Sequence, residues 1–122
     1  MGTLIYSPLE QGLLSGKFGA DHTFAEGDAR AERESFQPQA RAAINACIDA
    51  SVRPVAAAHG VTPAQAVLAW TLAQPGVTSI IAGCRDAAQV EENAAAATIE
   101  LTDAELNSID VAFAALDLGF SD

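Results

Sequence analysis

Two short segments rich in β-branched and aromatic residues constrain the fold class of this chain most. Residues 3–7 read Thr-Leu-Ile-Tyr-Ser, and residues 78–82 read Thr-Ser-Ile-Ile-Ala. This composition predicts β-strands, and we expect the second strand to be buried on both faces because it is so apolar. A strand followed by helices and a second strand is typical of the α/β class with parallel strands. Two strands do not complete such a sheet, so we expect the chain to form part of a larger one.

Apolar residues at helical spacing occur between the two predicted strands. From Gln39 to His59, apolar residues recur every three or four positions, which predicts a helix. Its apolar stripe consists of Ala40, Ile44, Cys47, Ile48, Val52, Val55 and Ala56. Pro54 predicts a kink or break near Val52, because proline lacks a backbone donor and clashes with the preceding turn.

Start and stop signals delimit the other helices. Residues 62–65, Thr-Pro-Ala-Gln, form a capping box with proline at the first helical position, and Pro75-Gly76 ends that helix. Asp86 predicts the start of a helix that runs to about Ala97. Residues 102–105, Thr-Asp-Ala-Glu, form a second capping box that begins the last helix.

Residues 19–38 show no sustained period and are polar and charged. A structureless segment of this length is uncommon inside a domain, so we predict a mobile or functional loop there. The chain has 122 residues, and residues 1–122 are predicted to form a single domain, since about 100–150 residues is typical.

The net charge of the chain bears on whether it can bind nucleic acid. Sixteen acidic and six basic residues give a net charge of −10, which repels phosphate backbones and argues against nucleic-acid binding. No apolar run approaches the roughly 20 residues of a membrane span, so we expect no membrane partner. The two cysteines, Cys47 and Cys84, are too few for a disulfide framework. A reducing, cytoplasmic location is therefore expected.

Three segments, in order, resemble the aldo-keto reductase family. Residues 6–18 read Tyr-Ser-Pro-Leu-Glu-Gln-Gly-Leu-Leu-Ser-Gly-Lys-Phe and are similar to the seventh barrel strand and its loop. Residues 60–78 resemble the seventh helix and the approach to the eighth strand. Residues 83–93, Gly-Cys-Arg-Asp-Ala-Ala-Gln-Val-Glu-Glu-Asn, resemble the cofactor segment after that strand.

The resemblance implies a partial TIM barrel made of the last two strand-helix units, from the seventh strand to the last helices. We expect it to be helix-rich, with repacking into a mostly helical dimer as the alternative to barrel geometry. In the family, NADPH reduces carbonyl compounds, and a tyrosine protonates the carbonyl with the help of an aspartate, a lysine and a histidine. These residues belong to earlier strands than the ones matched here. The resemblance therefore implies a truncated, NADP-binding segment without reductase activity of its own. We expect NADP binding to be weak or lost in the isolated chain, and the resemblance identifies no catalytic residue.

The resemblance also assigns cofactor positions. Tyr6 would lie under the nicotinamide, and Gly83 with Arg85 would hold the adenosine phosphate, because a guanidinium suits the 2′-phosphate of NADP. The positions expected to line the pyrophosphate are Ser7, Leu9, Gln11, Gly12 and Lys17. The positions expected to contact adenine, on one helix face, are Gln89, Glu92 and Asn93.

Each position also has a structural interpretation. Gln89 could complete a capping box with Asp86, and Arg85 could be an ordinary surface charge. Tyr6 could be a core residue, and Glu92 with Asn93 could form a solvated face. His59 suits a helix C-terminus.

Two other functions stay open. One is a new activity of a stand-alone fragment, such as metal-assisted hydrolysis by His22 or His59 with nearby carboxylates. His22 lies near Asp21 and Glu26, although two histidines are few for a dedicated zinc site. The other is an inert oligomeric scaffold.

Open strand edges predict self-association. The segments 4–6 and 80–82 would present unpaired edges, which template association. The high negative charge opposes unlimited aggregation, so we predict a homodimer. The candidate interface residues are Ile44, Ile48 and Val52 on one helix, and Leu106, Ile109 and Phe113 on another.

Overall fold

The computed structural model describes residues 2–6, 8–9, 12–17, 19 and 21–116. Two strands, β1 (Thr3–Tyr6) and β2 (Val77–Ile81), form a parallel pair. The helices between and after them are α1 (Pro38–Cys47), α2 (Arg53–His59), α3 (Pro63–Leu72), α4 (Ala87–Ala95) and α5 (Asp103–Ala114). The shorter helical segments are η1 (Leu13–Ser15), η2 (Ala29–Glu32), η3 (Glu34–Phe36), η4 (Ile48–Val52) and η5 (Ala96–Thr98). The chain is thus α/β and rich in helix, as predicted.

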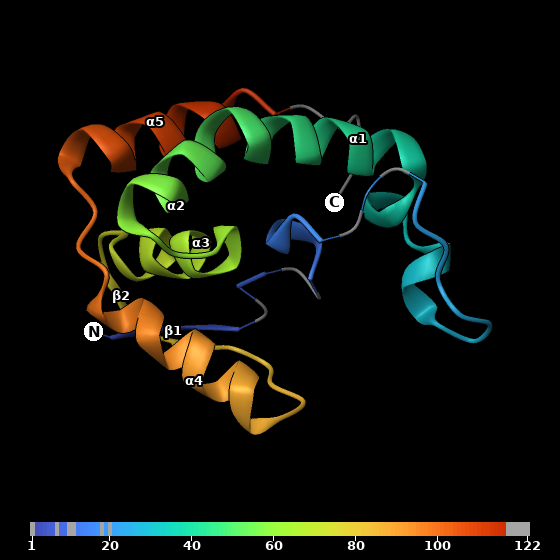
Figure 1. The fold of residues 1–122 in the computed structure, drawn as a ribbon, viewed down its shortest axis with the longest axis horizontal. Helices are drawn as coiled ribbons and strands as arrows, with labels where there is room; N and C mark the ends of the chain where they lie inside the picture. The colour runs from blue at the N-terminus through green and yellow to red at the C-terminus, as the bar shows by residue number, and fades with distance from the viewer. Residues whose placement is uncertain (1, 7, 10–11, 18, 20, 117–122) are drawn as a thin grey trace.

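Helix α3 is the central element. It contacts β2, α2 and α4, and Figure 1 shows α1, α2 and α5 on the side of α3 that faces away from the strands. Ala66, Val67 and Leu68 are fully buried, as expected for a helix that is apolar around its whole circumference. The predicted capping box is present, because Thr62 Oγ1 accepts from the Gln65 N–H while Gln65 Oε1 accepts from the Thr62 N–H.

The predicted break before Pro54 takes the form of a π-helical turn. Residues of η4 separate α1 from α2, and the Arg53 N–H donates to the Ile48 carbonyl five residues earlier. Pro54 then lies in the first turn of α2, so the wider turn comes directly before the residue whose ring would clash with a regular preceding turn. The side chains of Ile48 and Val52 are fully buried, so the wider turn keeps the apolar stripe continuous.

Segment 19–38 is not structureless, because it contains η2 and η3. Its anchor is Arg41 of α1, which is only 4% exposed. Arg41 Nε donates to the Phe36 carbonyl at 2.7 Å, and Nη1 donates to the carbonyls of Gly19 and His22 at 2.6 and 2.9 Å. Its guanidinium also lies 5.3 Å from the centre of the Phe24 ring. The buried guanidinium of Arg41 therefore connects both ends of this segment to α1 through hydrogen bonds. The mobility of the segment stays a prediction.

Two expectations about burial are wrong. Strand β2 is not buried on both faces, since Ser79 and Ile81, which alternation places on one face, are exposed. The reason is that α3 covers one face of the strand pair, while no described element buries the other. The predicted dimer stripe is also not a free surface. Its members Ile44, Ile48, Val52 and Ile109 form part of the chain's own core.

Candidate functional site

The carboxyl ends of β1 and β2 lie side by side. The parallel register pairs Tyr6 with Ile81, so the loops that follow the two strands leave from the same edge. In parallel α/β folds this edge is where ligands bind. The register therefore brings together the two segments predicted to hold the dinucleotide. Tyr6 is 79% exposed at this edge, so the alternative that it is a core residue is wrong.

The loop after β1 forms a compact glycine turn. The Leu9 carbonyl accepts from the Gly12 and Leu14 N–H groups at 3.0 and 3.1 Å. Gly12 has a φ of 94°, a conformation that favours glycine. The Ser15 hydroxyl donates to the Gly12 carbonyl at 2.6 Å, and Lys17 is exposed. Ser7 and Gln11, which were also predicted to line the pyrophosphate, lie outside the described residues.

The turn after β2 leads directly into α4. Asp86 Oδ1 accepts from the Gln89 N–H at 2.8 Å, so Asp86 caps the helix as predicted. The Gln89 side chain does not reach back to the cap residue itself. Its Oε1 accepts from the N–H of Arg85 at 2.7 Å, one residue earlier. The contact fixes the backbone of Arg85, and the Arg85 residue is exposed.

Gln89, Glu92 and Asn93 share one face of α4, as their spacing predicts. All three are half-buried, while Ala88, Val90 and Glu91 are exposed. This face of α4 makes hydrogen bonds with other parts of the chain. Glu92 Oε1 accepts from the Thr62 hydroxyl at 2.9 Å, which joins α4 to the start of α3.

Asn93 holds the turn that carries Gly83. Its Nδ2 lies 3.1 Å from the Cys84 sulfur and 3.4 Å from the Gly83 carbonyl, and it donates toward both. Open space surrounds the position that a Cβ on Gly83 would occupy. Two of the three residues predicted to contact adenine, Gln89 and Asn93, therefore hold the turn in place, while Glu92 contacts α3. Adenine contact stays a prediction.

Asp28, within the segment 19–38, has a lowered pKa. Hydrogen bonds from Arg30 lower the pKa of Asp28 to about 2, and the positive charge of Arg85 acts in the same direction. Arg30 Nη2 lies 2.6 Å from Asp28 Oδ2.

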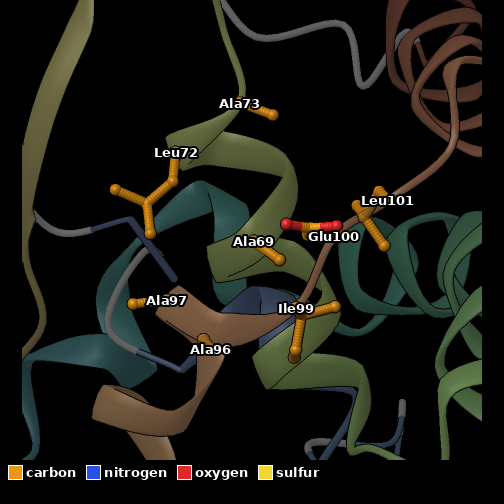
Figure 2. A pocket seen from close by; sticks show the side chains of 8 residues that line it. All are labelled: Ala69, Leu72, Ala73, Ala96, Ala97, Ile99, Glu100 and Leu101. Carbon is orange, nitrogen blue, oxygen red and sulfur yellow. The ribbon is translucent and has the colours of Figure 1, made fainter.

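A separate cavity of about 260 Å³ lies between α3 and the segment that joins α4 to α5 (Figure 2). Its walls are formed by Ala69, Leu72, Ala73, Ala96, Ala97, Ile99, Glu100 and Leu101. None of the residues predicted to bind the cofactor lines it. The cavity is therefore distinct from the edge described above.

The histidines have protein partners. The His22 ring packs edge-on against Phe24, with ring centres 4.9 Å apart. His59 Nε2 lies 2.9 and 3.0 Å from the two carboxylate oxygens of Glu105. Across the described part of the chain, no three His, Cys, Asp or Glu residues form a group that could hold a metal ion. No described cluster thus supports metal-assisted hydrolysis.

The contact between His59 and Glu105 predicts an acid-sensitive element of stability. The Thr102 N–H and then His59 hydrogen-bond to Glu105 and lower its pKa. A carboxylate whose pKa is lowered by folding stabilises the fold above its usual pKa of about 4.3, and this contribution is lost as pH falls through the folded value. We expect Glu105→Gln to lower the melting temperature at pH 7 and to converge with the unmodified protein near pH 3. Thermal melts over this range measure it.

The matched control is Glu91→Gln, which changes an exposed carboxylate on α4. Its melting temperature is expected to follow that of the unmodified protein at every pH. A constant difference between Glu105→Gln and the unmodified protein down to pH 3 would contradict the assignment.

Comparison with known proteins identifies the family. The sequence profile of the Aldo/keto reductase family matches residues 1–113. The NADH-specific methylglyoxal reductase of Escherichia coli (strain K12) is 38% identical over 101 residues, which cover 83% of this chain and 30% of that protein. The aldo-keto reductase yakc, an NADP(+) protein of Schizosaccharomyces pombe, is 33% identical over 104 residues, which cover 85% of this chain and 30% of that protein.

A solved structure gives the same result for the fold. The glycerol dehydrogenase of Gluconobacter oxydans superposes with a TM-score of 0.82 and 28% identity, over 99% of this chain and 36% of the dehydrogenase. The chain spans about a third or less of the proteins that it matches. None of its described helices is long and apolar enough to cross a membrane. The chain belongs to the aldo-keto reductase family.

Proposed function

We propose that this chain is the NADP-binding, C-terminal part of an aldo-keto reductase barrel. One observation supports the proposal most. The parallel register of Tyr6 with Ile81 places the glycine turn after β1 and the Arg85 turn after β2 at one strand edge. Family membership supplies the reaction class, reduction of a carbonyl group by a nicotinamide cofactor. The residues at this edge supply binding groups for the cofactor.

The chemistry of these residues fits a dinucleotide. The exposed Tyr6 ring offers a flat apolar surface for stacking. Gly12 has no side chain, so the turn backbone can come close to a phosphate group, and its positive φ is one that glycine adopts readily. Among the described residues, no carboxylate forms an ion pair with the exposed Arg85 guanidinium, which leaves it able to bind an anion. When bound, the cofactor supplies the hydride for carbonyl reduction.

Arg85 gives the proposal its sharpest test. A guanidinium can pair with the 2′-phosphate that distinguishes NADP from NAD. A hydrogen bond to a charged group contributes about 1.5–3 kcal/mol, so we expect Arg85→Ala to weaken NADP binding about tenfold or more and to change NAD binding little. Isothermal titration with each dinucleotide measures both affinities.

Arg33→Ala is the control, because Arg33 is also exposed and its loss changes the net charge equally. It is expected to leave both affinities unchanged. Equal affinities for NAD and NADP in the unmodified chain would overturn the NADP assignment. That result is a real alternative, since one relative is named as NADH-specific and another as an NADP(+) protein.

The catalytic tyrosine, aspartate, lysine and histidine of the family belong to strands outside the matched segments. We therefore expect the 122-residue chain alone to show negligible reduction of methylglyoxal with NADPH. General acid catalysis by a positioned group contributes about 10²–10⁴-fold, and this group is not supplied by the edge described here. Turnover that is abolished by Tyr6→Phe would contradict the prediction, because Tyr6 would then be the proton donor.

A further inference from the structure

One side chain from a distant helix holds the turn that follows β1. We call residues 12–17, which contain η1, the η1 turn. Arg53, the first residue of α2, donates from Nη2 to the Gly16 carbonyl at 3.2 Å. The two residues are 37 positions apart in the chain. The bond therefore connects the η1 turn to another part of the fold, directly before Lys17.

The backbone at Gly16 approaches the Arg53 guanidinium closely. A Cβ on Gly16 would lie 3.0 Å from Arg53 Nη2 and 3.6 Å from Ile48 Cγ2. Gly16 also has a φ of 75°, a conformation that favours glycine. The missing side chain at Gly16 thus lets the η1 turn come within hydrogen-bond reach of Arg53.

The π-helical turn η4 explains the direction of the Arg53 side chain. A π-helical turn contains about one residue more than an α-helical turn, so it rotates every later side chain by about 100° relative to a continuous α-helix. Arg53 is the first residue after η4, and its N–H closes the wide turn on the Ile48 carbonyl. Turns of this kind are frequent at functional sites. The offset gives Arg53 a direction that an uninterrupted helix would not.

Asp49 orients the guanidinium. Arg53 Nε donates to Asp49 Oδ1, while Nη2 donates to Gly16. The side chains of Arg53 and Asp49 are 49% and 61% exposed, and an ion pair this exposed adds little to stability by itself. A pair that only supported its own helix would not need the bond to Gly16. The three-membered arrangement is therefore better explained by a role in the η1 turn.

We propose that Arg53 is a positioning residue, which holds the η1 turn so that its backbone faces the pyrophosphate of the cofactor; this inference rests on the proposed function. Within the turn, the Gly12 carbonyl accepts from the Ser15 N–H and hydroxyl at 3.1 and 2.6 Å. The Ser15 hydroxyl also accepts from the Lys17 N–H at 3.3 Å. These bonds shape the turn internally. Leu14 attaches it to the core by apolar packing, which is not directional, and the bond from Arg53 fixes its orientation.

The test compares two ligands of the 122-residue chain, followed by the NMR signal of the Arg85 backbone amide. NADP would contact both the η1 turn and the Arg85 turn. Adenosine 2′-monophosphate has no pyrophosphate and would contact the Arg85 turn and α4 alone. We expect Arg53→Met to weaken NADP binding threefold or more and to leave the binding of adenosine 2′-monophosphate unchanged. A general loss of structure would weaken both.

Hydrogen exchange without ligand measures the η1 turn directly. The Leu14 and Ser15 amides donate within the loop after β1, and we expect both to exchange faster in Arg53→Met. The amides of Val67 and Leu68, in the buried helix α3, are expected to exchange at an unchanged rate.

Two further variants separate positioning from charge. Arg53→Lys keeps the positive charge but lacks the planar fork that reaches two acceptors, so we expect it to behave like Arg53→Met. Arg33→Met removes the same charge from another exposed position, and it is expected to change neither ligand affinity nor exchange.

The outcomes distinguish this inference from the proposed function. The inference alone is overturned if Arg53→Met weakens NADP binding less than threefold, weakens both ligands equally or leaves exchange in the η1 turn unchanged. Full recovery of NADP affinity in Arg53→Lys also overturns it, because the charge would then act without the fork. If the unmodified chain binds neither ligand, the proposed function fails, and the inference fails with it.

Discussion

Replacing Ile109 by Ala will lower the free energy of unfolding by about 2–5 kcal/mol, the range for large-to-small substitutions in a core. The Ile109 side chain is fully buried and joins α5 to a core that includes Ile48 and Val52. Removing three carbons there leaves a cavity that rigid helices on both sides cannot close. Urea unfolding followed by far-ultraviolet circular dichroism measures the loss.

The same helix provides the control. Val111 is 60% exposed, and alanine has the higher helix propensity. We expect Val111→Ala to change the free energy of unfolding by no more than about 0.5 kcal/mol. If Ile109→Ala is as stable as Val111→Ala, then α5 does not pack on the core as described.

Replacing Arg41 by Met will cost about 3 kcal/mol, because hydrogen bonds from a charged donor contribute about 1.5–3 kcal/mol each and the acceptors are left unpaired. Methionine keeps an apolar stem of similar length but donates no hydrogen bond. The carbonyls of Gly19, His22 and Phe36 lose their donor. We also expect faster proteolysis within residues 21–36, because their anchor to α1 is gone.

Arg33→Met is the matched variant, since Arg33 is exposed within the same part of the chain. It is expected to unfold at the same urea concentration as the unmodified protein. An unchanged unfolding midpoint and proteolysis rate for Arg41→Met would show that Arg41 does not hold the segment.

Local signals in the sequence predicted the elements well. The capping boxes at Thr62 and Thr102, the cap at Asp86 and the two strands are all present within a few residues of their predicted positions. The three helix caps depend on contacts between residues three positions apart, and the strands are marked by their β-branched and aromatic residues. Such contacts are fixed by the geometry of the helix start and need no knowledge of the rest of the fold.

Contacts between distant parts of the chain were not predicted. The pairing of His59 with Glu105 and of Thr62 with Glu92 joins different helices. The spacing of residues within one helix does not predict pairs that join two helices. Arg41 was detectable in principle, because it lies three and seven positions before Ile44 and Ile48 on the buried side of α1. A cation at such a position indicates buried acceptors nearby.

In the candidate site, too, local features were predicted and contacts between distant residues were not. The turn chemistry around Gly12 and Asp86 was accessible from the sequence, and the family resemblance assigned the cofactor positions. Helix spacing predicted the shared face of Gln89, Glu92 and Asn93. It could not predict that Glu92 contacts Thr62 or that Gln89 holds the Arg85 backbone, because these depend on how α4 sits against α3 and on the turn before it.

The most direct test of the cofactor assignment is an NMR titration of the 122-residue chain with NADPH. We predict that the NMR signals of the Gly12 and Arg85 backbone amides shift together, with one common half-saturation concentration, because the paired strand ends place both turns around one ligand. Shifts confined to one of the two turns, or no shift at either turn at the highest soluble concentration of NADPH, would contradict it.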